Sequence, residues 1–252
     1  MAYVILGRSE DINDLYIAGD FDPKHIKCEP ASMIEAERLD LISLQRLAQQ
    51  RELEKSSIKI SYLNVRSLRE HYQDVVKDPL LMNSDILGLG ETWLHEGETA
   101  DIPNYYATYV NSGKGKGLSA FCKSGLFTII LQESDASGLF VSHDRLDVVF
   151  LYLSHNFKWS TVMEFLENVI SPVKATVLMG DLNWHYPDSH PMKKYMKSKG
   201  FYQLSRRATH EKGRILDHLY ISEHLKETKM AVKQQSSYYS DHDTLKIYVP
   251  LQ

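Results

Sequence analysis

The sequence predicts a layered α/β domain from about residue 58 onward, because strand-like and helix-like segments alternate there. The apolar runs Lys59–Leu63 and Asp85–Leu89 flank a helix that begins near Leu68, where Ser67 and Glu70 form a capping box. Strands that alternate with helices along the chain are typical of layered α/β folds. The 252 residues, 43% hydrophobic and 25% charged, are enough to bury a sizeable core. This composition excludes a disordered or collagen-like chain.

The segment before residue 57 has a different character. Met1–Leu6 predicts a short strand, and Ser32 with Glu35 predicts a capping box that opens a helix extending to about Glu54. The apolar positions of this helix drift around its surface, and its remaining residues are rich in Glu, Arg and Gln. We therefore expect a mainly helical N-terminal extension that ends in a connecting helix.

The rest of the chain continues the α/β pattern. The predicted elements are strands at Leu126–Leu131 and Leu146–Leu153, a helix from about Thr161, a strand at Ala175–Met179, a basic helix ended by Gly200, and final strands at Ile215–Ile221 and Leu245–Val249. The region between residues 105 and 153 is strand-like throughout and is interrupted by glycines.

The charge distribution favours a local, rather than a global, anion-binding surface. The net charge of −4 argues against nucleic-acid binding through overall positive charge. The segment Lys193–Arg214 nevertheless concentrates basic residues, with Tyr195, Phe201 and Tyr202 between them. This mixture suits a phosphate backbone and stacked bases, although a solvated helix face would look the same.

Other features concern the cellular compartment. The longest uninterrupted apolar run, Val148–Leu153, is far shorter than the roughly 20 residues that span a bilayer, so we expect no membrane association. The amino end lacks the basic start and long apolar centre of a secretory signal. Cys28 and Cys122 lie far apart and suggest neither a disulfide framework nor a cysteine zinc site. We therefore expect an intracellular protein with reduced thiols.

Polar side chains stand directly after several predicted strands. Asn64 follows the strand that ends at Leu63, Glu91 follows an apolar run, and Asp181 and Asn183 follow another. Carboxylates and amides gathered at one rim of a sheet could hold a hard divalent cation and orient a water molecule. Taken singly, each of these residues is more often a turn residue than a ligand.

Asp217 is predicted to be buried, because the alternation in its strand places it on the same face as Leu219 and Ile221. A buried carboxylate needs a partner, and His242 in the tripeptide Ser240–His242 could supply one. Such a pair would fix the tautomer of the histidine and raise its basicity. The alternative is an ordinary surface pair.

These residues, taken in order, resemble the endonuclease/exonuclease/phosphatase superfamily over about residues 58–249. The resemblance is carried by six motifs: NVRSL at Asn64, GET at Glu91, a strand tyrosine at Tyr152, GDLN at Asp181 and Asn183, TH…LDH through Thr209 and Asp217, and SDH at Ser240–His242. The short form is similar to the endonuclease domains of non-LTR retrotransposons, which are relatives of apurinic endonucleases and deoxyribonuclease I. It implies two packed β-sheets flanked by helices, a four-layer sandwich, and a Mg2+-dependent phosphodiester hydrolase.

The resemblance implies a role for each matching residue. The catalytic set is Asp181, Asn183, His242, Asp217 and Tyr152. The metal-binding set is Glu91, Asn64 and Asp241. The substrate-side set is Thr209 and Ser240, to which we add Arg206 and Arg207 from the basic stretch.

Within these sets the implied chemistry is specific. Asp181 would position or deprotonate the attacking water, and Asn183 would donate a hydrogen bond to a phosphate oxygen. His242, paired with Asp217, would contact the phosphate and stabilise the charge that develops there. The phenol of Tyr152 would donate to another phosphate oxygen. Such donors commonly supply the largest catalytic effect.

The N-terminal segment carries a resemblance of its own. AYVILGRSEDINDLYIAGDFDPKHIKCEP looks like the last segment of Pif-like DNA helicases, and Arg8 matches an arginine that faces ATP phosphates in that family. The sequence has no phosphate-binding Gly-Lys-Thr loop, so we expect no ATP binding. A helicase tail joined to an endonuclease resembles Helitron-type transposon proteins. We therefore divide the chain into a helicase-tail remnant with a connecting helix, residues 1–56, and an endonuclease/exonuclease/phosphatase domain, residues 57–252.

The leading functional hypothesis is a Mg2+-dependent endonuclease that nicks DNA, with Mn2+ as a substitute ion, in a protein derived from a transposable element. One alternative is the same fold acting on RNA or on another phosphate ester, since one fold hosts many functions. Another is a nucleic-acid-binding remnant without activity. The substrate class places the protein in the nucleus. The sequence specifies no oligomeric state.

Overall fold

The computed structural model describes residues 30–124 and 127–250. The strand predicted at Met1–Leu6 and the helicase-like segment lie outside these residues, so both remain predictions. The chain divides into two units, with the boundary between Arg51 and Glu52. This boundary lies within the first described helix, α2 (Pro30–Lys55).

The start of α2 corrects one sequence prediction. The helix begins at Pro30, two residues before the predicted cap at Ser32, so Ser32 lies inside the first turn. Proline favours the first helical position because its fixed φ suits the helix and its missing N–H has no helical partner there. The capping box predicted for Ser32 and Glu35 is therefore wrong, whereas the predicted end of the helix near Glu54 is confirmed.

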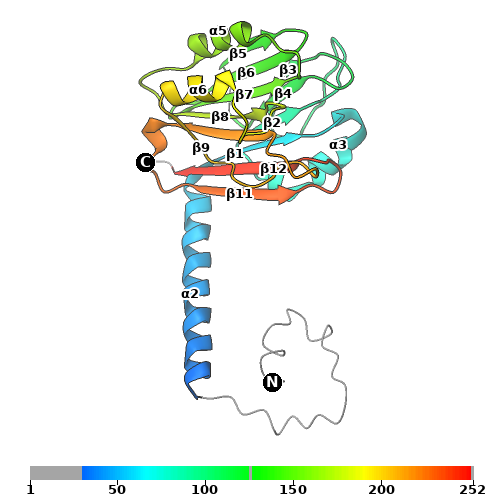
Figure 1. The fold of residues 1–252 in the computed structure, drawn as a ribbon. Coiled ribbons are helices and arrows are strands. Elements are labelled where there is room, and N and C mark those ends of the chain that lie inside the picture. The colour runs from blue at the N-terminus through cyan, green and yellow to red at the C-terminus, as the bar shows by residue number, and fades with distance from the viewer. Residues whose placement is uncertain (1–29, 125–126, 251–252) are drawn as a thin grey trace. The chain divides into compact units, whose positions relative to one another are not determined.

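The second unit contains two six-stranded sheets (Figure 1). The strands of the first sheet, in spatial order β11-β12-β1-β2-β4-β3, are β11 (Ala231–Ser236), β12 (Asp243–Pro250), β1 (Ser57–Asn64), β2 (Ile86–Gly90), β4 (Leu118–Cys122) and β3 (Tyr106–Val110). Only β1 and β2 run parallel among these neighbours.

The second sheet repeats this plan. Its strands, in spatial order β5-β6-β7-β8-β10-β9, are β5 (Phe127–Gln132), β6 (Ala136–Ser142), β7 (Asp147–Leu153), β8 (Thr176–Asp181), β10 (Asp217–Ser222) and β9 (Phe201–Gln203). Its one parallel pair is β7 and β8. Each sheet thus has a parallel pair at its centre and antiparallel strands around it.

Helices cover the outer face of each sheet. They are α3 (Leu68–Lys77) and α4 (Pro79–Met82) on the first sheet, α5 (Trp159–Val169) and α6 (Pro191–Ser198) on the second, and a 3-10 turn, η3 (Glu223–Leu225), after β10. One apolar core lies between the sheets, and one more lies between each sheet and its helices. The predicted four-layer α/β sandwich, with two packed sheets, is confirmed.

Two strands escaped the sequence analysis. β11, at one edge of the first sheet, has the polar sequence AVKQQS and is only partly buried, and β9, at one edge of the second sheet, has three residues. Neither offers the apolar run by which the central strands were recognised. One of the two bonds of the capping box before α3 is confirmed: Ser67 Oγ accepts from the Glu70 N–H at 3.3 Å. The Ser67 N–H donates to the Glu91 carbonyl instead of to the Glu70 side chain.

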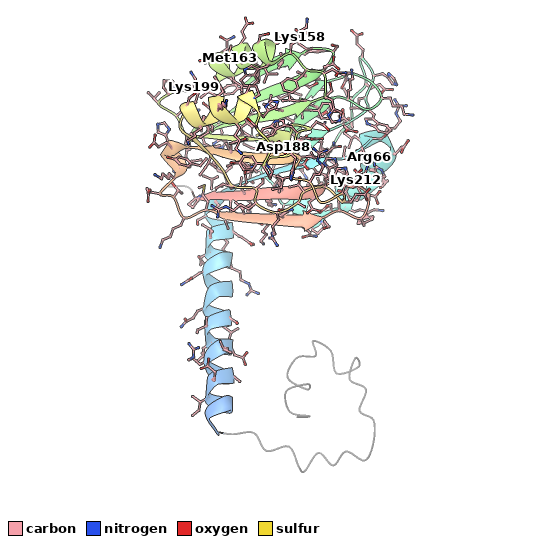
Figure 2. The ribbon with its side chains drawn as sticks, in the orientation of Figure 1. Arg66, Lys158, Met163, Asp188, Lys199 and Lys212 are labelled. Carbon is pink, nitrogen blue, oxygen red and sulfur yellow. The ribbon has the colours of Figure 1, made fainter. Side chains whose placement is uncertain are left out.

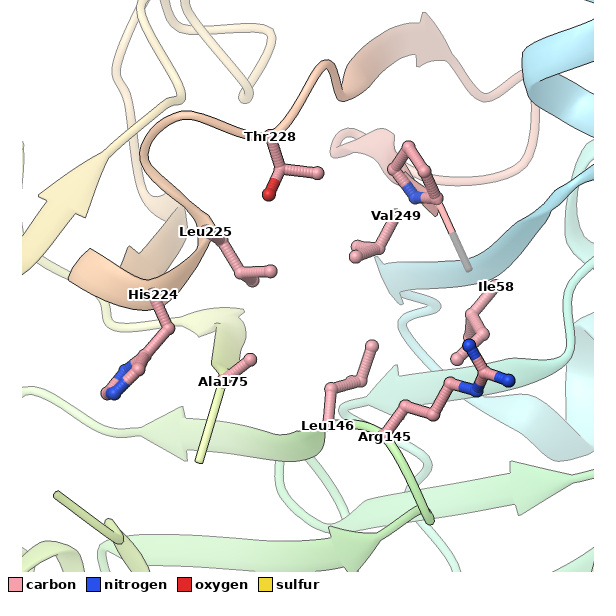
Figure 3. A pocket seen from close by; sticks show the side chains of 9 residues that line it. Ile58, Arg145, Leu146, Ala175, His224, Leu225, Thr228 and Val249 are labelled. Carbon is pink, nitrogen blue, oxygen red and sulfur yellow. The ribbon is translucent and has the colours of Figure 1, made fainter. Parts of the chain in front are cut away.

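One end of the sandwich opens into a cavity of about 420 Å³ (Figure 3). Its lining includes Ile58 near the start of β1, Leu146 before β7 and Ala175 before β8. The parallel strands of both sheets therefore start at this end, and their carboxyl ends meet at the opposite rim, where polar side chains can gather.

We predict that Gly180→Ala destabilises the domain. Gly180 lies opposite Leu151 in the parallel β7–β8 pair, and a Cβ at this position would overlap the Leu151 backbone oxygen. Because backbone cannot turn aside as a side chain can, the free energy of unfolding should fall by roughly 3 kcal/mol. Chemical denaturation monitored by circular dichroism measures this change. The exposed Ser160→Ala in α5 is the control, and an unchanged midpoint for the glycine variant would contradict the prediction.

Candidate active site

The carboxyl ends of the central strands bring the predicted residues together. Asn64 ends β1, Glu91 directly follows β2, and Asp181 ends β8. Tyr152 in β7 lies beside Asp181 in the parallel register, and Asp217 at the start of β10 lies opposite Asp181 in the antiparallel one. The sheet topology therefore places five sequence-distant residues at one rim.

The amide of Asn64 links two carboxylates. Its Nδ2 donates to Glu91 Oε1 at 3.0 Å and to Asp181 Oδ2 at 2.8 Å, while its Oδ1 accepts from the backbone N–H of Arg66 at 3.2 Å. Asn64 itself is fully buried, and Glu91 is partly exposed. The side chain that the sequence assigned to metal binding therefore orients Glu91 and Asp181.

Asp217 and His242 form the predicted pair. Asp217 Oδ2 lies 2.8 Å from His242 Nδ1, and the other ring nitrogen, Nε2, lies 4.0 Å from Asp181 Oδ2. Asp217 is fully buried and His242 is 5% exposed. The contact fixes Nδ1 as a proton donor, so Nε2 faces Asp181. The imidazole thus lies between two buried carboxylates.

Burial and mutual charge shift the protonation of this cluster. Burial and the neighbouring charge of Asp217 raise the pKa of Asp181 to about 7, against the opposing effects of His242 and Asn64. Burial alone would lower the pKa of His242, but the charges of Asp217, Asp181 and Asp241 raise it to about 10. His242 is therefore protonated at neutral pH, and Asp181 exchanges its proton in the same range.

Thr209 and Ser240 position other members of the site. Thr209 Oγ1 accepts from the backbone N–H groups of Leu216 and Asp217 at 3.0 and 2.9 Å. Ser240 Oγ donates to the carbonyl of Asn64 at 2.6 Å. The Thr209 hydroxyl thus holds the start of β10 in place, and the Ser240 hydroxyl holds the end of β1. Their predicted role on the substrate side stays a prediction.

Asn183 and Tyr152 are at the rim with their donors already engaged. Asn183 Nδ2 donates to the Leu153 carbonyl at 2.8 Å, and the Tyr152 hydroxyl donates to the Gly115 carbonyl at 2.9 Å. The Tyr152 oxygen also lies 3.5 Å from Glu91 Oε1. Contact with a phosphate oxygen would require each side chain to exchange or share its present bond.

Asp241 adjoins His242 at the edge of this cluster, whereas Arg206 and Arg207 make no hydrogen bond or ion pair with it in the described structure. Asp241 Oδ2 pairs with Arg66 at 2.8 Å, and its Oδ1 lies 3.9 Å from His242 Nε2. Arg206 and Arg207 are exposed, and no hydrogen bond within residues 30–124 and 127–250 ties either to the clustered residues. Neither arginine therefore hydrogen-bonds to the clustered side chains, and their substrate role stays a prediction.

Three neighbours were missed by the sequence reasoning. Arg66, which is labelled in Figure 2, is exposed and pairs with Asp241. The indole Nε1 of Trp93 donates to Glu91 Oε2 at 3.2 Å. His210 packs its ring edge-on against His242 at 4.7 Å, with Nε2 3.4 Å from Asp241. Arg66 and His210 lie inside the NVRSL and TH motifs, so the motifs pointed to these positions but did not predict their contacts with Asp241 and His242.

The chain turns sharply after β1, β2 and β8. Five non-glycine residues there have a positive φ: Arg66 (47°), Ser67 (94°), Glu91 (46°), Trp93 (56°) and Asn183 (55°). L-residues adopt this region rarely and at a cost of about 1–3 kcal/mol, and such positions concentrate at functional sites. The strand ends that carry Asn64, Glu91 and Asp181 are therefore each followed by a strained turn.

Two groups of side chains could hold a metal ion. They are His210, Asp241 and His242, and Asp181, Asp217 and His242. Each group offers ligand atoms that lie within 4.8 Å of one another. One oxygen of Asp217, Oδ1, is buried without a hydrogen-bond partner in the described structure, as is Asp241 Oδ1. Glu91 lies outside both groups but adjoins the second through Asn64.

The sequence identifies the family. Residues 61–242 match the model of the Endonuclease/Exonuclease/phosphatase family, and the chain belongs to this family. Its members are hydrolases that act on phosphodiester bonds. No curated protein matches the sequence.

Solved structures with the same fold include nucleases and a phosphatase. An AP endonuclease from Archaeoglobus fulgidus has a TM-score of 0.61 and 17% identity, over 77% of this chain and 100% of that chain. The endonuclease domain of TRAS1, a telomere-specific non-LTR retrotransposon, has a TM-score of 0.59 and 11% identity, over 78% and 99%. The 3′ phosphatase NExo from Neisseria, bound to a product DNA hairpin, has a TM-score of 0.62 and 16% identity, over 77% and 100%. These similarities establish the fold.

We predict that Asp217→Asn lowers the pKa of His242 from about 10 toward its ordinary value of 6.5, because the substitution removes the nearest opposing charge. The stability contributed by protonated His242 is fully present below pH 6.5 and is lost as the pH rises through about 10. The difference in unfolding free energy between wild type and variant should therefore shrink across this interval.

An NMR titration of the His242 ring in metal-free protein, with urea unfolding at several pH values, measures both effects. Asp144→Asn, at an exposed position between β6 and β7, is the control. A variant whose His242 still titrates with a pKa near 10 would show that Asp217 is not the main partner.

Proposed function

We propose that this protein is a Mg2+-dependent endonuclease that nicks DNA. The observation that carries the proposal is the buried arrangement in which His242 lies between the carboxylates of Asp217 and Asp181, beside the partly exposed Glu91. The rim thus combines a base, a protonated donor and oxygen ligands. Metal-dependent hydrolysis of a phosphodiester requires these three kinds of group.

The donor set fits a hard divalent cation. Glu91 and Asp181 supply carboxylate oxygens, and Asn64 joins them through its amide. The orphaned Oδ1 of Asp217 adds a buried acceptor without a partner. Oxygen ligands of this kind suit Mg2+, with Mn2+ as a substitute. When bound, the ion would neutralise phosphate charge and polarise the scissile group.

Asp181 is suited to accept a proton from water. A base works best when its pKa is close to the operating pH, and the pKa of Asp181 is raised to about 7. Asn64 holds Asp181 Oδ2, and the backbone N–H of Asn183 holds Oδ1 at 2.9 Å. The carboxylate is therefore fixed in orientation before substrate arrives, which lowers the cost of aligning a water molecule.

His242 is suited to stabilise developing negative charge. It is protonated at neutral pH, and Asp217 fixes its ring so that Nε2 is directed to the side where Asp181 lies. A protonated donor held in place needs no reorganisation when charge appears on the phosphate. Asn183 and Tyr152 would add neutral donors if substrate displaced their present carbonyl acceptors.

We predict that Asp181→Asn and His242→Ala each reduce nicking of supercoiled plasmid by roughly a hundredfold or more in the presence of Mg2+. The first change removes the base, and the second removes the charged donor. Agarose gel electrophoresis resolves nicked from supercoiled plasmid, with EDTA as the metal-free reference and Asp144→Asn as the control. Wild-type protein that leaves plasmid intact with both Mg2+ and Mn2+ would contradict the proposal. Parallel reactions with RNA and with a phosphoinositide test the other phosphate esters.

We predict that Glu91→Gln weakens divalent-ion binding without unfolding the protein. Glutamine keeps the size of the side chain, and its single amide oxygen can accept from Asn64 or from Trp93 but not from both. The substitution also removes one negative charge from the ligand set. Isothermal titration with Mn2+ should show an affinity at least roughly tenfold lower. Glu96→Gln, at an exposed position in the following loop, is the matched control. Equal affinities for the wild type and the Glu91 variant would remove Glu91 from the metal site.

The proposal extends to the origin of the protein. The order of the NVRSL, GDLN and SDH motifs and the helicase-like N-terminal segment support derivation from a transposable element of the Helitron type. The same reasoning assigns residues 1–56 to the helicase-tail remnant with its connecting helix and residues 57–252 to the nuclease. A DNA substrate would place the protein in the nucleus. None of the helices in the described structure is long and apolar enough to cross a membrane.

A further inference from the structure

A second pocket lies at the edge of the second sheet, outside the site described above. It measures about 690 Å³ and is formed by β9, its neighbour β10 and the end of α6. Its lining includes four cationic side chains and no acidic one: Lys193, Lys197, Arg206 and Lys226. No ion pair in the described part of the chain joins any of the four to a carboxylate. In a chain with a net charge of −4, this is a local concentration of positive charge.

Aromatic side chains accompany these cations. The ammonium of Lys226 lies 5.2 Å from the ring centroid of Tyr202, and that of Lys193 lies 4.4 Å from the ring of Tyr186. Tyr202 is 37% exposed, so part of its ring faces solvent. Cations and exposed aromatic rings together are the surface on which single-stranded nucleic acids bind, through phosphate and base respectively.

Gln203 supplies a third feature of the pocket. Both its amide nitrogen and its amide oxygen are buried, and neither has a hydrogen-bond partner in the described structure. Leaving such groups unpaired is costly, and native proteins do so rarely. A side-chain rotation would turn the amide into the pocket, where its donor and acceptor match the edge of a nucleobase, adenine above all.

The pocket is connected to the active site by one strand. Asp217 begins β10 at the catalytic rim, and Tyr220 and Ile221 in the same strand line the pocket. At about 3.3 Å per residue, the two are separated by roughly 10–13 Å along the strand. Nucleotides stacked at about 3.4 Å would cover this distance in about three or four steps.

We propose that this pocket binds an unpaired nucleotide of the substrate strand, with Lys193, Lys197, Arg206 and Lys226 contacting phosphates and Gln203 reading the base. The inference rests on the proposed function for the identity of the strand as DNA. The pocket holds a nucleotide that lies a few steps from the phosphate at the catalytic rim. It thereby gives the protein a grip on single-stranded DNA that does not depend on a metal ion.

Binding of a fluorescent oligodeoxyadenylate in EDTA, measured by fluorescence anisotropy, tests this site without catalysis. Lys226→Glu should weaken binding roughly tenfold and reduce the slope of log affinity against log salt by about 0.7 for each phosphate that the protein no longer neutralises. Gln203→Leu should weaken binding of this oligonucleotide roughly tenfold. It should leave unchanged the affinity for an oligonucleotide of abasic spacers, which has no base edge to read.

Lys158→Glu, an equal charge change at the start of α5, is the control and should leave both affinities unchanged (Figure 2). Thermal unfolding of each variant identifies any loss of fold, and the exposed Lys226 keeps the test valid if Gln203→Leu unfolds the protein. Unchanged oligonucleotide affinity in Lys226→Glu would overturn the proposal. Equal affinity of the wild type for the oligodeoxyadenylate and for the abasic spacer oligonucleotide would also overturn it. Equal affinity for AMP and for the oligodeoxyadenylate would overturn it as well, because that result would indicate a site for free nucleotides.

Plasmid nicking by the same variants separates this proposal from the proposed function. If wild type binds the oligonucleotide through its bases but nicks nothing with any metal ion, the endonuclease proposal fails and the nucleotide site stands. If wild type nicks plasmid while the pocket variants bind the oligonucleotide as wild type does, the nucleotide site fails and the endonuclease proposal stands.

Discussion

The central constraint of this structure is the burial of two carboxylates opposite each other. Asp181 and Asp217 face one another across the β8–β10 pair, and both are almost completely buried. Two negative charges so placed would repel strongly in a medium of low polarity. Protonated His242 reduces this repulsion, because its positively charged ring lies between the two carboxylates. The pKa of Asp181 and that of His242 therefore depend on each other and on the charge of Asp217.

The surrounding structure holds this set in place. Asn64 restrains Asp181 from the first sheet, while Thr209 restrains the backbone at Asp217 and Ser240 ties the loop before β12 to the end of β1. These bonds cross between the two sheets or between a sheet and a loop. Packing of the sheets and geometry of the site thus depend on each other, as is usual where a rigid scaffold positions catalytic groups.

Much of the fold could be predicted because the central strands are apolar and bounded by turn residues. The burial of Asp217 followed from alternation in its strand, and its pairing with His242 followed from the need of a buried carboxylate for a partner. The edge strands β9 and β11 could not be found, because they are short or polar and are stabilised by their neighbours. The start of α2 was misplaced because Pro30 and Ser32 both carry signals for a helix N-terminus.

The site was less predictable than the fold wherever contacts join distant segments. The sequence grouped Arg206 with Thr209 and Ser240, but only the folded chain shows that Arg206 lines the pocket at the β9 edge while the two hydroxyls bond within the site. The interaction of Arg66 with Asp241 joins residues far apart in the sequence and leaves no local pattern. His210 lies next to the predicted Thr209, but only the folded chain shows that its ring packs against His242. Local patterns indicate which strand ends carry polar residues, whereas loop paths decide which of these residues touch.

Residues with a left-handed backbone conformation follow β1, β2 and β8, and they limit which substitutions this rim can accept. Because the backbone at Glu91 and Asn183 is held in a conformation that β-branched side chains tolerate poorly, valine, isoleucine or threonine would be disfavoured there even if their polarity were acceptable. A designer who transplanted the six motifs onto another α/β scaffold would have to copy the bends as well as the side chains. The conformation of the loops is therefore as much a mark of common ancestry at such a site as the identity of its residues.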